Sequence, residues 1–143
     1  MVIKTQSSAE TEQAGELLAK KLRPGDVIAY TGPMGAGKTT FTVGLARGMG
    51  LAAWVSSPTF SLVHQYPSAG GGPGLCHFDM YRIDNPEDLY STGFFDYLDS
   101  GDVLAVEWSE HIRDVLPAGT ITVDIQPEGE SRRRITITGD ERF

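Results

Sequence analysis

The sequence has a single cysteine, Cys76, in 143 residues, so no disulfide can form within the chain. A lone cysteine agrees with a reducing compartment. Its place in an apolar, strand-like run predicts a small buried side chain rather than a reactive thiol. No apolar run approaches the roughly 20 residues of a membrane span, and residues 1–4 do not begin a signal peptide. These absences predict a cytoplasmic protein with no membrane segment.

Basic residues are also few. The chain has 12 Lys and Arg against 19 Asp and Glu, a formal net charge of −7, which argues against a broad surface that neutralises nucleic-acid phosphates by itself. The one basic cluster is Arg132, Arg133 and Arg134. It falls where a hairpin strand is expected, so an exposed strand face is the simplest interpretation. A contact with a phosphate or a partner is the alternative.

The length allows one domain, residues 1–143, with a substantial core but no room for a second core. A hydrophobic content of 40% and a charged content of 22% are typical of a globular protein. We find no internal repeat and no low-complexity tract. The glycine-rich segment 69–74 predicts the tip of a long hairpin rather than a linker between domains.

The most informative pattern is G-x-x-x-x-G-K-T at residues 32–39. A β-branched run at 27–31 precedes it and a helical stretch at 40–47 follows, which is the context that a phosphate-binding P-loop requires. Glycines let successive N–H groups point inward, and the helix adds the positive end of its dipole. Lys38 would reach the β- and γ-phosphates, and the hydroxyl of Thr39 is the expected Mg²⁺ ligand. A glycine-rich turn with an incidental lysine is the alternative.

The remaining elements follow from capping and periodicity. Ser7 and Glu10 form a capping-box pattern ahead of apolar residues on one face, which predicts a first helix that ends before Pro24 and Gly25. We expect further helices from Asn85 and across 109–116. Strands are expected at 27–31, 61–66, 75–79, 103–106, 121–125 and 135–138. Mixed helices and strands around a buried central strand predict a three-layer α/β fold of the P-loop NTPase type with a mixed sheet.

A nucleotide site also needs an acidic residue at the end of a strand close to the P-loop strand, because Mg²⁺ prefers oxygen ligands. Glu107 follows four apolar residues, the Walker-B form with Glu in place of the more frequent Asp. This pattern predicts a metal ligand. The alternative is an acidic residue that simply begins the next turn.

The segment His77-Phe78-Asp79-Met80-Tyr81-Arg82 offers a second carboxylate at a strand end. Asp79 could orient the attacking water or hold the water shell of the metal, and Arg82 could stabilise charge on the transferring phosphoryl group. A structural ion pair between the two is the alternative. His77 invites a metal interpretation, but with one cysteine and three scattered histidines we expect no transition-metal site.

Residues 56–60, Ser-Ser-Pro-Thr-Phe, follow the P-loop helix where many P-loop proteins place a switch segment. Pro58 fixes the chain locally, and Ser57 or Thr59 could offer a hydroxyl to the γ-phosphate or the metal. Equally, Phe60 could be a core anchor in an ordinary turn.

The order of four motifs is more specific than any one of them. A G-x-M-G-A-G-K-T-T loop, then S-P-T-F, then H-x-D-x-Y-R, then an apolar strand that ends in E-W resembles the TsaE (also called YjeE) family. Its members are the small ATPase components of the bacterial machinery that makes threonylcarbamoyladenosine in tRNA. The likeness extends from residues 11–15, which resemble the T-x-x-x-G of the family, to the C-terminal strands.

The resemblance implies roles for particular residues. Thr39 and Glu107 would hold Mg²⁺, while Asp79, Arg82 and Trp108, with the P-loop lysine, would serve ATP hydrolysis. The residues expected around the nucleotide are Thr11, Gly32, Gly35, Ala36, Gly37, Lys38, Thr39, Thr40 and Arg134.

The resemblance also implies partners. Proteins similar to this one bind a transferase subunit (TsaD) and its paralogue (TsaB), and ATP hydrolysis resets that complex between turnovers. The tRNA would be gripped mainly by these partners, which is compatible with the acidic balance of this chain.

Other functions are open on the same core. A nucleoside or metabolite kinase needs a second substrate pocket, usually with an arginine-bearing lid, and little sequence remains for one after the P-loop helix. A GTPase-like switch would need an N-K-x-D guanine motif, but the only asparagine is Asn85. A purely structural module would bind no nucleotide.

Overall fold

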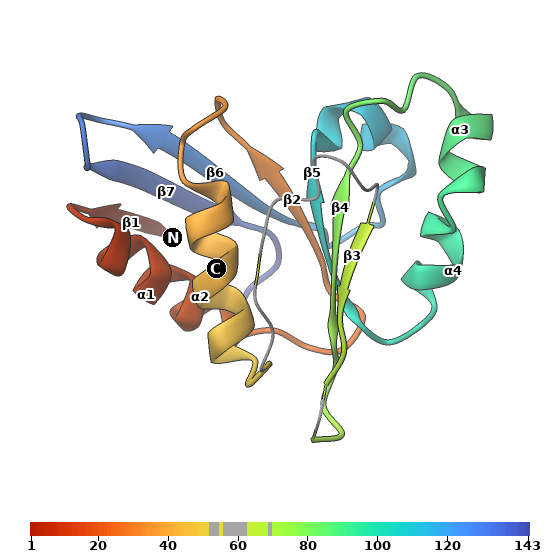
Figure 1. Cartoon of the computed structure of the whole chain (residues 1–143), viewed down its shortest axis with the longest axis horizontal. Coiled ribbons are helices and arrows are strands. Elements are labelled where there is room, and N and C mark those ends of the chain that lie inside the picture. The colour runs from red at the N-terminus through yellow and green to blue at the C-terminus, as the bar shows by residue number, and fades with distance from the viewer. Residues whose placement is uncertain (52–54, 56–62, 69) are drawn as a thin grey trace.

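The computed structural model describes residues 1–51, 55, 63–68 and 70–143. Within these residues seven strands form one sheet in the order β1-β7-β6-β2-β5-β4-β3 (Figure 1). The strands are β1 (Val2–Thr5), β2 (Val27–Thr31), β3 (Val63–Tyr66), β4 (Leu75–Asp79), β5 (Val103–Glu107), β6 (Ile121–Pro127) and β7 (Arg133–Thr138). The helices are α1 (Ser8–Ala19), α2 (Lys38–Gly48), α3 (Pro86–Ser91), α4 (Phe94–Leu98) and the 3₁₀ segment η1 (Ser109–Val115).

The centre of the sheet is parallel. Strand β2 pairs in parallel with β5 and β6, and β5 pairs in parallel with β4. Antiparallel pairs of β3 with β4, β6 with β7, and β1 with β7 complete the two sides. Because the carboxyl ends of β2, β4, β5 and β6 meet at one edge, the loops that follow them share one end of the molecule.

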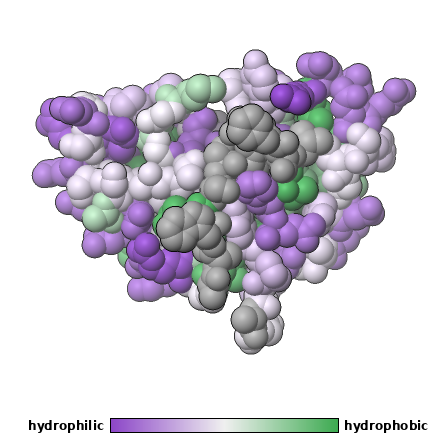
Figure 2. Space-filling model, viewed as in Figure 1, coloured by the Kyte–Doolittle hydropathy of each residue, from purple (hydrophilic) through white to green (hydrophobic). Residues whose placement is uncertain are grey.

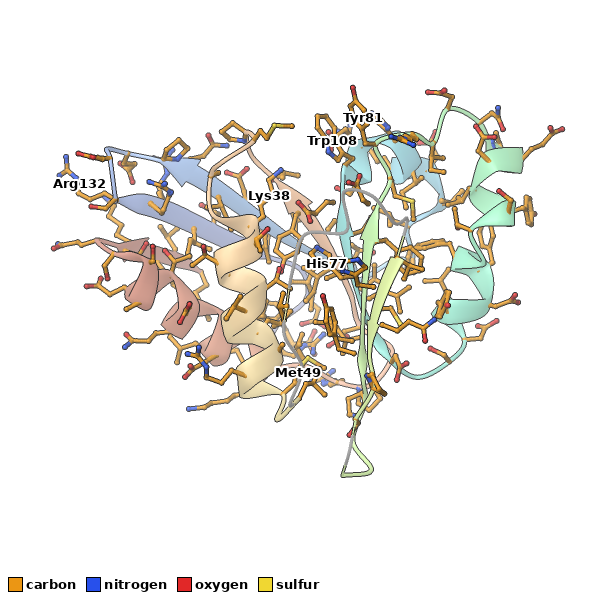
Figure 3. The ribbon with its side chains drawn as sticks, in the orientation of Figure 1. Lys38, Met49, His77, Tyr81, Trp108 and Arg132 are labelled. Atoms are coloured by element: carbon orange, nitrogen blue, oxygen red, sulfur yellow. The ribbon has the colours of Figure 1, made fainter. Side chains whose placement is uncertain are left out.

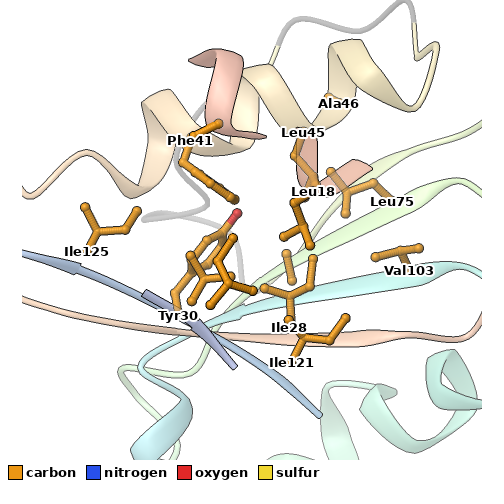
Figure 4. Packing of buried hydrophobic residues seen from close by; sticks show 14 of the residues in the cluster. Leu18, Ile28, Tyr30, Phe41, Leu45, Ala46, Leu75, Val103, Ile121 and Ile125 are labelled. Atoms are coloured by element: carbon orange, nitrogen blue, oxygen red, sulfur yellow. The ribbon is translucent and has the colours of Figure 1, made fainter. Parts of the chain in front are cut away.

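Helices cover both faces of the sheet (Figure 1). Alternation along β5 sends Val103 and Ala105 into the core beneath α1 and α2, and Leu104 and Val106 into the core beneath α3, α4 and η1. In the first core the rings of Tyr30 and Phe41 meet edge to face with centroids 6.0 Å apart, between β2 and α2 (Figure 4). The predicted three-layer α/β fold with a mixed sheet is confirmed.

Helix α1 packs closely on α2. A Cβ at Gly44 would collide with the backbone of Glu12, so the two helices approach at a distance that only glycine allows. Arg47 of α2 then reaches back to Glu12 and Glu16 of α1 at 3.1 and 3.0 Å. This packing holds α2, and with it the loop at its start, against the sheet.

Most predicted elements are present. Ser7 accepts a hydrogen bond from the N–H of Glu10 at 3.2 Å, as the capping pattern predicts. Helix α1 ends at Ala19, short of Leu22, because the N–H groups of Lys21 and Leu22 turn back to the carbonyls three residues earlier. Of the helix predicted at 109–116, Ser109–Val115 form a 3₁₀ helix with a kink rather than a regular α-helix.

The hairpin and the cysteine also agree with the sequence. Strands β3 and β4 pair as an antiparallel hairpin with His64 opposite His77, and residues 61–62 of the predicted strand lie outside the described residues. Cys76 is buried, and burial, with a smaller effect of Asp102, raises the pKa of its thiol to about 12.

Strand β1 and helix α4 were not predicted. Strand β1 is four residues long and pairs with β7 from the other end of the chain, so local periodicity gives no sign of it. The face of the molecule in Figure 2 is largely hydrophilic, with apolar residues in small patches. In the part of the chain that is described, no helix has the length and apolar character needed to cross a bilayer.

Candidate phosphate-binding site

The loop between β2 and α2 depends on left-handed glycines. Gly32, Gly35 and Gly37 have φ angles of 118°, 77° and 109°, a region that residues with a side chain rarely adopt. Gly32 also passes β6 so closely that a Cβ there would collide with the carbonyl oxygen of Ile125. The glycines of the sequence pattern are therefore required by the path of the backbone.

Helix α2 begins at Lys38 without a side-chain cap, since Gly37 precedes it. The first N–H groups of a helix have no partner inside the helix, and the positive end of the dipole lies with them. An uncapped helix start that faces a glycine-rich loop is suited to bind an anion. Figure 3 shows Lys38 at the top of α2, at the edge of the sheet where the parallel strands end.

A buried chain of hydroxyl groups fixes α2 to β2. Thr42 donates to the carbonyl of Lys38 at 2.8 Å, and its oxygen lies 2.7 Å from the hydroxyl of Tyr30. Because Thr42 has only one proton, Tyr30 is the donor in the second bond. Burial raises the pKa of Tyr30, which keeps its hydroxyl protonated. The start of α2 is thus tied to the strand that carries the loop.

Two carboxylates end the neighbouring strands. Asp79 is opposite Glu107 in the register of β4 and β5, and β5 is the direct neighbour of β2. The side chain of Glu107 is 14% exposed. Asp79 accepts a hydrogen bond from the N–H of Tyr81 at 2.9 Å. Carboxylates at this edge, with the hydroxyl of Thr39 in the first turn of α2, are hard oxygen donors of the kind that Mg²⁺ prefers.

The carboxylate of Glu107 has a buried neighbour. Nε2 of His77 lies 2.7 Å from Oε2 of Glu107, and the His77 side chain is 0% exposed. The sequence suggested no role for His77 other than that of a transition-metal ligand, which we did not expect. The usable signal was the alternation along β4, which puts His77 and Asp79 on the same face of the strand.

Aromatic side chains gather at the same edge of the sheet. Trp108, directly after Glu107, has a φ of 57° and is the only non-glycine residue in the described part of the chain with a positive φ. Its ring lies 4.9 Å from that of Tyr81 and 5.7 Å from that of His111, and Figure 3 shows Trp108 and Tyr81 together. Arg82 is exposed, and the ion pairs among the described residues include none between Asp79 and Arg82.

On the other side of the loop, Arg133 of β7 contacts the backbone of the loop. Its Nε donates to the carbonyl of Ala36 at 2.7 Å, and its NH1 group donates to carbonyls of the turn between β6 and β7. Arg134, the expected residue, is exposed. Ile135 and Ile137 point into the core beneath α1 and α2, so alternation puts Arg133 on the face of the loop and Arg134 on the opposite face.

Thr11 lies beside the loop as well, but its hydroxyl is 2.9 Å from that of Thr5. A Cβ at Gly37 would lie 3.8 Å from Cγ2 of Thr11 and from Nε of Arg133. A hollow of about 100 Å³ opens here, and its lining residues are Ser8, Thr11, Gly37, Thr40, Glu130, Ser131 and Arg133. Ser57, Thr59 and Phe60 of the expected switch segment lie outside the described residues.

A parallel sheet centre, a glycine-rich loop that leads into an uncapped helix, and an acidic residue at the end of the adjacent strand define the P-loop NTPase class of fold. The family model described as "Threonylcarbamoyl adenosine biosynthesis protein TsaE" matches residues 5–135. The chain therefore belongs to the TsaE family, and the resemblance in the sequence is confirmed.

Similar individual proteins support membership of the TsaE family. Two proteins named "tRNA threonylcarbamoyladenosine biosynthesis protein TsaE" come from Bacillus subtilis and Streptomyces coelicolor. The first is 39% identical over 136 residues, 94% of this chain and 83% of that protein. The second is 37% identical over 131 residues, 89% of this chain and 88% of that protein. The crystal structure of YdiB from Bacillus subtilis matches with a TM-score of 0.82 and 32% identity over 100% of this chain and 88% of that one.

The hydroxyl chain beneath the loop can be tested by a double-mutant cycle. Thr42→Val leaves the buried hydroxyl of Tyr30 without an acceptor and should lower the free energy of unfolding by about 1–3 kcal/mol. Tyr30→Phe removes that hydroxyl, so the double variant should lose less than the sum of the two single losses, by at least about 0.5 kcal/mol. Urea denaturation of the four proteins measures this. Strictly additive losses would show that the two hydroxyls are not coupled.

Proposed function

We propose that this chain binds ATP with Mg²⁺ in the loop between β2 and α2 and hydrolyses it. In this role it is the ATPase that resets the transferase complex of tRNA threonylcarbamoyladenosine biosynthesis. Membership of the TsaE family supports the pathway. The loop supports the chemistry, because three left-handed glycines and an uncapped helix start present N–H groups to an anion.

The phosphates would be held by the N–H groups of residues 35–40 and by the ammonium group of Lys38. Thr39 and Glu107 would hold Mg²⁺, which when bound neutralises charge on the phosphate oxygens. The donor set fits the metal, since a hydroxyl and a carboxylate are oxygen ligands and Glu107 ends the strand next to that of the loop.

Hydrolysis would depend on the second carboxylate. Oδ1 of Asp79 already accepts a hydrogen bond from the N–H of Tyr81, which leaves the other oxygen to accept a hydrogen bond from a water molecule and orient it. Attack of that water on the γ-phosphorus breaks the bond to the bridging oxygen and gives ADP and phosphate. We assign charge stabilisation to Arg82 and place Trp108 against the same edge, beside Glu107.

The proposed partners are a TsaD-like transferase subunit and its TsaB-like paralogue. The formal charge of −7 supports contact with tRNA mainly through these partners, because an acidic surface repels phosphates. The exposed side chains at the strand ends, Tyr81 and Arg82, lie where a partner could respond to the presence of a γ-phosphate.

Lys38→Ala tests the nucleotide site. The loss of the ammonium group should weaken binding of a non-hydrolysable ATP analogue at least about tenfold, a change of about 1.4 kcal/mol, and should remove ATP hydrolysis. Equilibrium titration and phosphate release measure the two effects. The matched control is Lys20→Ala, an exposed lysine at the end of α1, which should behave as the wild type.

Product analysis in the same assay separates hydrolysis from a kinase reaction. Inorganic phosphate in water is the expected product with or without nucleosides and metabolites. Phosphate on an added acceptor would favour the kinase function. Full ATPase activity of Lys38→Ala would contradict the proposal that the loop between β2 and α2 binds the nucleotide.

Arg133 and Arg134 form a matched pair for the other side of the loop. Arg133→Met removes the hydrogen bond to Ala36 that joins the loop to β7, and it should weaken binding of the ATP analogue about fivefold, equivalent to about 1 kcal/mol. Arg134→Met removes an arginine on the opposite face and should leave the affinity unchanged. Titration of both variants with the ATP analogue measures the two effects. A larger loss of affinity in Arg134→Met would support the expectation from the sequence that Arg134 lies beside the nucleotide.

The resetting role predicts a difference between binding and hydrolysis. Purified chain should join the TsaD-like and TsaB-like proteins in a nucleotide-dependent complex on gel filtration. Asp79→Asn should still form that complex, but it should support only one round of tRNA modification because it hydrolyses ATP slowly. Radiolabelled threonine in tRNA counts the rounds. Repeated rounds with Asp79→Asn, or without this chain, would contradict the role.

A further inference from the structure

His77 contacts the candidate site, but the proposed chemistry does not yet use it. It lies in the middle of β4, opposite Ala105 of β5, and its ring is 6.2 Å from that of Tyr30 in β2. Figure 3 labels it beside β4. Its side chain is 0% exposed, with Nε2 at 2.7 Å from Oε2 of Glu107. Within the described residues, neither Nδ1 of His77 nor Oε2 of Glu107 has another hydrogen-bond partner.

The contact is close but bent. The two atoms are within hydrogen-bond distance, yet their angle is not that of a straight hydrogen bond. Hydrogen bonds around a site are often poorly aligned before its ligand is bound. Burying ring nitrogens costs free energy unless a polar group compensates them. Among the described residues, the contact with Glu107 is the one that can do so for His77.

Glu107 needs such a neighbour. It is the last residue of β5, and the chain turns at once through Trp108 with its left-handed φ of 57°. A glutamate side chain has several rotatable bonds, and ordering it costs conformational entropy unless a contact has already restricted it. Groups that hydrogen-bond a metal-binding carboxylate orient it in this way, and their loss typically weakens metal binding or activity 10–100-fold.

We propose that His77 is a positioning residue for Glu107. Nε2–H of His77 donates to Oε2, which restricts the carboxylate and leaves its other oxygen for Mg²⁺ at the P-loop. The inference rests on the proposed role of Glu107 as a metal ligand. His77 itself contacts neither metal nor nucleotide, so its removal should change the response to Mg²⁺ and spare metal-free nucleotide binding.

The test compares side chains that keep or lose a donor at the position of Nε2. In His77→Gln the amide nitrogen can replace Nε2, in His77→Asn it falls short, and in His77→Leu there is none. The readout is the Mg²⁺ concentration that gives half of the gain in affinity for a non-hydrolysable ATP analogue. We expect an increase of about tenfold or more in the Asn and Leu variants and less than about threefold in the Gln variant. Affinity in EDTA should stay unchanged in all three.

Phe78→Leu is the control for a merely structural effect. Phe78 is the next residue of β4 and points into the other core, where its ring contacts those of Phe94 and Tyr97. It should lower thermal stability without changing the Mg²⁺ midpoint. Thermal unfolding of every variant confirms that it is folded, and the Gln–Asn comparison stands alone if His77→Leu does not fold.

Glu107→Ala separates this inference from the function on which it rests. If Glu107→Ala shifts the Mg²⁺ midpoint and His77→Asn and His77→Leu do not, then the positioning role of His77 is wrong while the metal site stands. If Glu107→Ala leaves the midpoint unchanged, the proposed metal site itself fails. In the Glu107→Ala background, His77→Leu should cause no further shift, because it acts only through that carboxylate.

Discussion

The structure depends on a backbone path that only glycine can follow, between the end of β2 and the start of α2. Gly32, Gly35 and Gly37 take left-handed conformations there, and Gly32 leaves no room for a side chain beside β6. The same path leaves the first N–H groups of α2 without partners and aims them at the loop. The glycines that the fold requires therefore also create the proposed anion site.

The strands beside β2 supply the other residues of the candidate site. Strand β5, paired in parallel with β2, brings Glu107 to the edge from which the loop departs, and β4 adds Asp79 next to it. On the other side, β6 and β7 bring Arg133 against the carbonyl of Ala36. Helix α1 packs closely on α2 at Gly44, and this packing helps to hold α2 against the sheet. Membership of the TsaE family links this arrangement to threonylcarbamoyladenosine biosynthesis.

Local patterns in the sequence were enough for the loop, the strand ends and the fold class, because each depends on residues close together in the chain. Contacts between residues on different strands could not be predicted in the same way. The pairing of His77 with Glu107 depends on the order of β4 and β5, which no local pattern states. The contact of Arg133 with the carbonyl of Ala36 was not predicted, because it depends on which face of β7 meets the helices. Strand β1 was missed because its partner lies more than a hundred residues away.

The most direct measurement is a crystal structure of the chain with Mg²⁺ and a non-hydrolysable ATP analogue. We expect the triphosphate along the N–H groups of residues 35–40, and the metal between the hydroxyl of Thr39 and the carboxylate of Glu107. A nucleotide bound at another place on the chain, or a metal that Glu107 does not touch, would contradict it.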